Sequence, residues 1–178
     1  VEGYRSRSAY KLLEINNKFK ILKNHISLLD LGSSPGGWSQ VSSKLIKKGK
    51  ILAIDIKNME AVNGVKFILG DINDQKSIDK IGDYFDNKID VIISDMAANT
   101  TGNKNLDSFK TGELCLKAMD LAQNILHKDG VFLSKFFMGS IFQEINKKAK
   151  KYFRKVVNYK PASSKKESKE IYIYCKGI

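Results

Sequence analysis

Cysteine, proline and histidine are scarce in this chain of 178 residues, with two of each. Cys115 and Cys175 stand far apart and form no C-x-x-C motif, which excludes a disulfide framework of the kind that small secreted modules need. His25 and His127 show no metal-ligand spacing either. We therefore expect neither a bound metal nor a secreted protein.

Long apolar runs are also missing, since no stretch approaches the roughly 20 residues that a membrane-spanning helix requires. We expect no membrane partner. The chain begins at Val1 rather than at methionine, so we expect that an upstream segment has been removed, and the sequence does not show whether that segment was a targeting peptide. The expected location is the cytoplasm or an organelle, which would be the mitochondrion in a eukaryote.

Acidic residues are outnumbered. Lysine and arginine total 31 against 19 aspartates and glutamates, for a net charge of +12. This excess favours a polyanionic partner, although a lysine-rich composition with a solvated surface would look the same. Hydrophobic residues make up 42% of the chain, which is enough to bury a core. The length suits a single domain over residues 1–178, and we expect a monomer.

Short apolar runs alternate with helical patterns along the chain, which predicts a three-layer α/β domain with a mainly parallel sheet. The predicted strands are residues 27–31, 50–56, 65–69, 89–94, 131–137, 153–159 and 171–175. The predicted helices are residues 8–19, 36–47, 74–82, 112–126 and 140–152. Polar segments 99–110 and 160–169 are predicted loops. Because the second loop has no helical pattern, the last two strands are expected to form an antiparallel hairpin.

Charged residues recur where the predicted strands end. Asp30, Asp55, Asp71 and Asp95 lie at or just after the first four strand ends, and Lys135 lies near the end of the fifth. The ends of parallel strands face one edge of an open sheet, where ligands bind at the switch in strand order. Several such residues in succession therefore indicate a binding cleft.

A glycine-rich turn follows the first strand, in the sequence LDLGSSPGGW. Its glycines, Gly32, Gly36 and Gly37, fit the GxGxxG spacing of dinucleotide-binding dehydrogenases poorly, and a plain tight turn is the alternative. Asp55 stands where Rossmann-type folds place an acid on ribose hydroxyls. Asp71 is a candidate acceptor for an adenine amino group. Trp38 either packs against a cofactor or seals the cleft.

Four motifs together resemble one family. LDLGSSPGGWSQ, SDMAAN, KPASSKKESKEIYIY and the N-terminal YRSRSAYKLLEI are similar to motifs of the FtsJ/RrmJ family of S-adenosylmethionine-dependent RNA ribose 2′-O-methyltransferases. The resemblance runs from Tyr4 to Gly177 in the family's order. It implies a Rossmann-like class I methyltransferase fold with a seven-stranded sheet, and S-adenosylmethionine as cofactor.

The resemblance also implies functional residues. The family's catalytic Lys-Asp-Lys-Glu tetrad falls on Lys11, Asp95, Lys135 and Glu170. Its cofactor contacts map to Gly36, Trp38, Asp55, Asp71 and Asp95, beside the turn glycines Gly32 and Gly37. Ala98 replaces the usual proline, and Ser33 and Ser34 replace commoner alanines, which puts loop rigidity in doubt rather than activity.

The expected partner is RNA, held by basic residues on both sides of the site. These are Arg5, Arg7, Lys165, Lys166 and Lys169, the first two expected on the N-terminal helix. The resemblance favours large-subunit ribosomal RNA, within a subunit or its precursor, and a uridine ribose of the A-loop. A tRNA anticodon-loop methyltransferase, a nicotinamide-dependent oxidoreductase and a non-catalytic RNA-binding assembly module are the alternatives. Whether Lys135 is a true base or an orienting group stays open.

Overall fold

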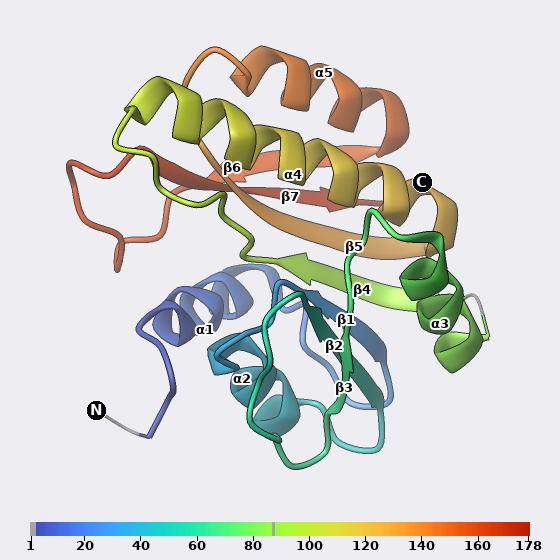
Figure 1. Ribbon diagram of the computed structural model, residues 1–178. Helices are drawn as coiled ribbons and strands as arrows, with labels where there is room; N and C mark the ends of the chain where they lie inside the picture. The colour runs from blue at the N-terminus through green and yellow to red at the C-terminus, as the bar shows by residue number, and fades with distance from the viewer. Residues whose placement is uncertain (1–2, 87) are drawn as a thin grey trace.

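The computed structural model describes residues 3–86 and 88–178 (Figure 1). Its strands are β1 (Ser27–Leu31), β2 (Lys50–Asp55), β3 (Lys66–Leu69), β4 (Ile89–Ser94), β5 (Leu126–Phe137), β6 (Lys155–Tyr159) and β7 (Glu170–Lys176). Its helices are α1 (Ser8–Phe19), α2 (Gly37–Leu45), α3 (Gln75–Phe85), α4 (Lys104–Ile125) and α5 (Phe142–Tyr152).

The strands form one seven-stranded sheet in the order β3-β2-β1-β4-β5-β7-β6. The first five run parallel, and β7 pairs antiparallel with both β5 and β6. The predicted parallel sheet with a terminal hairpin is therefore confirmed. The strand order reverses between β1 and β4, which is the switch point where open α/β sheets bind ligands.

Helices cover both faces of the sheet and make three layers, as predicted (Figure 1). Neighbouring residues of a strand point to opposite faces, so β1 supplies Leu28 to one core and Leu29 to the other. The Leu28 core includes Leu12 of α1 and Val41 of α2. The Leu29 core includes residues of α3, α4 and α5, such as Met119 of α4. Apolar burial on both faces thus positions α1 beside the strand ends.

Helix α4 begins at Lys104, eight residues before the predicted start at residue 112. The polar segment 99–110 resembled a loop because its first helical turns carry no buried apolar stripe. Asn103 caps the helix, since its side-chain oxygen accepts a hydrogen bond from the backbone N–H of Leu106 at 3.1 Å. The prediction of a loop was therefore wrong for residues 104–110.

Smaller boundary differences have similar local causes. Strand β5 begins at Leu126, where a helix end was predicted, because Leu126 pairs with Ile89 of β4. Residues 160–169 contain no helix or strand, as predicted. Of the helices in residues 3–86 and 88–178, none combines the length and apolar character needed to cross a membrane.

Replacing the capping residue tests the early start of α4. We expect Asn103→Ala to lower the free energy of unfolding by about 1 kcal/mol, because the Leu106 N–H loses its acceptor. Urea unfolding followed by circular dichroism measures the change. Asn105→Ala is the matched control, since Asn105 is exposed within the same helix. Equal effects of the two substitutions would show that Asn103 does not cap α4.

Candidate functional site

Four charged side chains from distant parts of the chain meet at the carboxyl ends of the parallel strands. Lys11 lies on α1, Asp95 directly follows β4, Lys135 lies near the end of β5 and Glu170 begins β7. Lys11 Nζ is 2.5 Å from Glu170 Oε1. Lys135 Nζ is 3.4 Å from Asp95 Oδ1 and 4.0 Å from Glu170 Oε2. The four residues predicted as a tetrad therefore form one contact network, which we call the tetrad.

Strand pairing and helix packing bring the four together. In the antiparallel β5–β7 pair, Phe137 faces Glu170 and Lys135 faces Tyr172, so the end of β5 lies beside the start of β7. Helix α1 is held by the fully buried Leu12, which directs the neighbouring Lys11 toward the strand ends. The side chains of the tetrad are between 11% and 23% exposed, so water has limited access to the network.

Tyr172 completes the network, and sequence reasoning missed it. Its hydroxyl lies 2.9 Å from Asp95 Oδ1 and 3.2 Å from Glu170 Oε1. Burial and the two carboxylates hold the Tyr172 pKa well above its usual value, so the phenol keeps its proton and remains a donor. The signal in the sequence was the alternation in Glu170-Ile-Tyr, which puts both side chains on one face of β7.

Asp95 links the tetrad to the interior of the protein. Burial raises the pKa of its carboxyl, and the nearby Glu170 carboxylate adds to the rise. The Lys135 ammonium and the Tyr172 hydrogen bond act in the opposite direction. Two lysines and two carboxylates balance in formal charge, which is the condition under which buried charges are tolerated.

The glycine-rich turn between β1 and α2 needs its glycines for two reasons. Gly32 and Gly36 have φ values of 68° and 121°, in the region that favours glycine. A Cβ on Gly37 would collide with the hydroxyl of Ser6, so the N-terminal segment lies directly against the turn. Asp55 braces it, because Asp55 Oδ2 accepts a hydrogen bond from the Ser34 N–H at 2.9 Å.

A hollow of about 80 Å³ lies between this turn and the tetrad. Four residues of the predicted cofactor set line it, namely Gly32, Gly37, Trp38 and Asp95. Trp38 is 3% exposed and its indole N–H donates to the Ser8 carbonyl at 2.9 Å, so the ring joins α2 to α1 and forms part of the wall. Three other predicted residues, Gly36, Asp55 and Asp71, lie outside this lining, and Asp71 is exposed.

Asp30 also lines the hollow, and its carboxyl group is only partly satisfied. Ser39 Oγ donates to Asp30 Oδ2 at 2.7 Å, whereas Asp30 Oδ1 is buried with no hydrogen-bond partner among the described residues. Burial raises the Asp30 pKa to about 7, with smaller contributions from the charges of Asp95 and Asp55. An unsatisfied carboxyl oxygen in the wall of a hollow suits a cationic ligand group.

The predicted RNA-binding residues fall into two groups. Arg7 precedes α1 and is exposed, and Lys165, Lys166 and Lys169 are exposed in the loop that leads into Glu170. Arg5 differs from the expectation. It lies before the helix, and its guanidinium donates to the backbone carbonyls of Pro35, Glu60 and Ala61 at 3.1, 2.6 and 2.7 Å. Its donors therefore hold the N-terminal segment against the glycine-rich turn.

Residues 160–169, which we call the basic loop, are joined to α1 by the carboxylate of Glu14. Glu14 Oε2 accepts hydrogen bonds from the Tyr159 hydroxyl and the Ala162 N–H, both at 2.6 Å, and Glu14 Oε1 accepts from the Ser163 N–H at 2.9 Å. Burial raises the pKa of Glu14, but these hydrogen bonds outweigh it and the net shift is downward. The loop and the helix that carries Lys11 are thus positioned by the same contacts.

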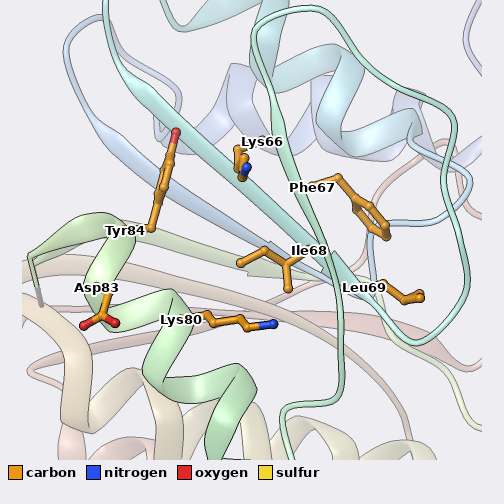
Figure 2. A pocket seen from close by; sticks show the side chains of 7 residues that line it. All are labelled: Lys66, Phe67, Ile68, Leu69, Lys80, Asp83 and Tyr84. Carbon is orange, nitrogen blue, oxygen red and sulfur yellow. The ribbon is translucent and has the colours of Figure 1, made fainter.

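Another hollow, of about 600 Å³, lies far along the sheet between β3 and α3 (Figure 2). Its walls include Phe67 and Leu69 of the edge strand β3 and Lys80 and Tyr84 of α3. It contains none of the predicted site residues. Within residues 3–86 and 88–178, no group of three or more histidine, cysteine, aspartate or glutamate side chains is arranged to hold a metal ion.

The comparisons with known proteins agree on one family. The profile described as FtsJ-like methyltransferase matches residues 4–178. A Pelagibacter ubique protein named ribosomal RNA large subunit methyltransferase E is 52% identical over 99% of this chain and 87% of its own length. A Rickettsia akari protein of the same name is 44% identical over 97% of this chain and 79% of its own length.

Solved structures give the same result for the fold. A Plasmodium falciparum protein described as a ribosomal RNA methyltransferase superposes with a TM-score of 0.86 at 35% identity, covering 98% of both chains. A Streptococcus mutans protein solved in complex with SAH has a TM-score of 0.62 at 15% identity, covering 93% of this chain and 97% of its own. At that identity the likeness concerns the fold alone.

The raised pKa of Asp30 predicts a pH-dependent cost of burial. Below about pH 4 the Asp30 carboxyl is protonated in both the folded and the unfolded chain. As the pH rises from about 4 to about 7, the unfolded chain gains stability by ionising Asp30 while the folded chain does not, so the free energy of unfolding falls. The free energy of unfolding of Asp30→Asn, relative to that of the parent, should therefore rise by about 2–3 kcal/mol when the pH is raised from about 5 to about 8. Urea unfolding at both pH values measures this difference.

Asp83→Asn, at an exposed acid, is the matched control and should show little pH-dependent difference from the parent. A difference between Asp30→Asn and the parent that does not change with pH would contradict the raised pKa of Asp30.

Proposed function

This chain belongs to the FtsJ-like methyltransferase family, and from that membership we propose that it transfers a methyl group from S-adenosylmethionine to a ribose 2′-hydroxyl of ribosomal RNA. The relatives that carry the name ribosomal RNA large subunit methyltransferase support the class of substrate. The observation that carries the proposal is the convergence of Lys11, Asp95, Lys135 and Glu170 beside the hollow under the glycine-rich turn.

The residues around the hollow fit the proposed cofactor. Gly32, Gly36 and Gly37 let a ligand approach the backbone closely. Asp30 Oδ1 offers a buried acceptor for the ammonium group of the cofactor's amino-acid end. Each oxygen of the Asp55 carboxylate accepts one backbone N–H, from Ser34 or Lys57, and keeps a second lone pair for a ribose hydroxyl. Asp71, exposed after β3, is assigned to the adenine amino group.

The chemistry follows from the position of the tetrad. S-adenosylmethionine, when bound, supplies a methyl group on a positively charged sulfur. Lys135 orients the 2′-hydroxyl as its base or hydrogen-bond partner, and Asp95 holds Lys135 at the wall of the hollow. Lys11 and Glu170 hold the other side of the network. Orienting two bound reactants contributes roughly 7–11 kcal/mol to such reactions, and proton transfer adds about 10²–10⁴-fold.

The proposed RNA surface consists of Arg7, Lys165, Lys166 and Lys169, which would contact phosphates without reading bases. Arg5 instead donates its side-chain hydrogen bonds to backbone carbonyls and holds the N-terminal segment against the glycine-rich turn. We propose that residues 1–178 act as one domain and as a monomer on the large ribosomal subunit or its precursor. The proposed target is a uridine of the A-loop.

Mass mapping of ribosomal RNA tests the proposed function. Large ribosomal subunits that lack the modification are incubated with the protein and isotope-labelled S-adenosylmethionine, and 2′-O-methyl nucleotides are located by mass spectrometry. We expect one labelled ribose, at a uridine of the A-loop. Transcripts of tRNA are the control substrate. Label that enters tRNA and not the subunit would overturn the assignment to ribosomal RNA.

Removing the central lysine tests its role in the reaction. We expect Lys135→Ala to lower kcat by about 10²–10⁴-fold while S-adenosylmethionine binding, measured by calorimetry, stays within about twofold. Lys128→Ala is the matched control, because Lys128 is an exposed lysine on the same strand. A Lys135→Ala protein that keeps full methylation with an unchanged melting temperature would remove Lys135 from the mechanism.

A further inference from the structure

A third hollow, of about 340 Å³, lies beside the tetrad and shares no lining residue with the hollow at the glycine-rich turn. We call it the β4–α4 pocket. Its walls come from the segment after β4, the first turns of α4, the end of β5 and the basic loop. The residues that matter here are Ala97, Ala98, Ser108, Thr111, Phe137 and Lys169. Its volume falls in the range of about 300–1,000 Å³ typical of small-ligand sites.

The pocket and the tetrad share structural elements. Ala97 is two residues beyond Asp95, and Phe137 is two residues beyond Lys135, on the same face of β5. Phe137 also faces Glu170 across the β5–β7 pair. The next residue along, Met138, donates its backbone N–H to the Lys169 carbonyl at 2.8 Å. A group bound in the pocket is therefore adjacent to whatever the tetrad contacts.

Hydrogen bonds hold the walls of the pocket in place. The fully buried Thr111 accepts the Ala98 N–H on its hydroxyl at 3.1 Å. Asp107 accepts the N–H and the hydroxyl of Thr101 at 2.9 and 2.7 Å, and these hydrogen bonds lower the Asp107 pKa, so the carboxylate persists. Since α4 begins at Lys104, the pocket wall is a helix rather than the long loop expected from the sequence.

The lining suits a flat ring with a polar edge. The Ala97 and Ala98 side chains and the Phe137 ring are apolar, and an aromatic face is what unstacked RNA bases pack against. Ser108 Oγ is buried and has no hydrogen-bond partner in the described part of the chain, although a hydroxyl can both donate and accept. The lining also holds two lysines, Lys104 and Lys169, and two acids, Asp107 and Glu167, so it is neutral in formal charge, as suits an uncharged base.

We propose that the β4–α4 pocket receives the base of the nucleotide whose ribose is methylated, turned out of its RNA strand. The base stacks on Phe137 and hydrogen-bonds to Ser108, which leaves its ribose beside Lys135 and Glu170. This inference rests on the proposed function and names the part of the substrate that fixes which nucleotide reacts. Phe137 and Ser108 are then substrate-binding residues, separate from the cofactor hollow.

Nuclear magnetic resonance on the ¹⁵N-labelled protein tests the pocket without catalysis. Uridine 5′-monophosphate should shift the amide signals of Ala97, Ala98 and Ser108. Ribose 5-phosphate, which lacks the base, should leave them unchanged. The pocket assignment is overturned if the nucleotide leaves these signals in place at millimolar concentration, if it shifts only signals elsewhere, or if the two ligands act alike.

Matched substitutions test the pocket during catalysis. Phe137→Leu should lower kcat/KM for the large ribosomal subunit by roughly 5- to 150-fold, through loss of stacking, and leave the S-adenosylmethionine dissociation constant unchanged. Phe109→Leu, at a residue 43% exposed on α4 and outside the pocket lining, should stay within about twofold of the parent. Ser108→Ala should lower kcat/KM by about three- to tenfold. Melting temperatures identify any variant that is merely misfolded.

The two proposals fail differently. If the parent protein transfers no methyl group to the subunit but uridine 5′-monophosphate still shifts the pocket amides, the proposed function fails, and the pocket binds a nucleotide base without selecting a methylation target. If the parent methylates the subunit and Phe137→Leu and Ser108→Ala both match it in kcat/KM, the function stands and the base pocket is wrong.

Discussion

The pairing of buried charges at the strand ends is the constraint on which this site depends. Each lysine has a carboxylate partner: Lys11 pairs with Glu170, and Lys135 pairs with Asp95. Only this pairing allows the four charged groups to be largely shielded from water. Removing one partner would leave an uncompensated charge in a shielded place, which is far more costly than losing a surface ion pair. Tyr172 adds one neutral hydroxyl within hydrogen-bond distance of both carboxylates.

The antiparallel direction of β7 is what makes that pairing possible. In a wholly parallel sheet the first residue of a strand lies at the edge opposite to the ligand-binding edge. Because β7 runs against β5, its first residue, Glu170, lies beside the end of β5 and therefore beside Lys135. The C-terminal hairpin thus has a chemical role as well as completing the sheet. The same reversal places Lys169 at the rim of the β4–α4 pocket.

The N-terminal segment connects the two halves of the site. Helix α1 packs its buried face on the sheet, carries Lys11 to the tetrad and holds the basic loop through Glu14. The residues before it lie against the glycine-rich turn, where Arg5 donates to the Pro35 carbonyl, and Arg5 also donates to the carbonyls of Glu60 and Ala61 between β2 and β3. One short stretch of chain therefore holds the glycine-rich turn, the tetrad and the basic loop, so a change in α1 affects all three.

The sequence by itself determined the alternation of strands and helices, the acids at successive strand ends and the antiparallel hairpin, because periodicity and connection length are local properties. Motif resemblance identified Lys11 and Glu170, which no local pattern could have joined across 158 intervening residues. Only the tertiary structure decided three features: the place of Tyr172 in the network, the hydrogen bonds from Arg5 to backbone carbonyls, and the start of α4 at Lys104. Each depends on which backbone and side-chain groups from other elements lie within hydrogen-bond distance, and that follows from packing rather than from neighbours in the chain.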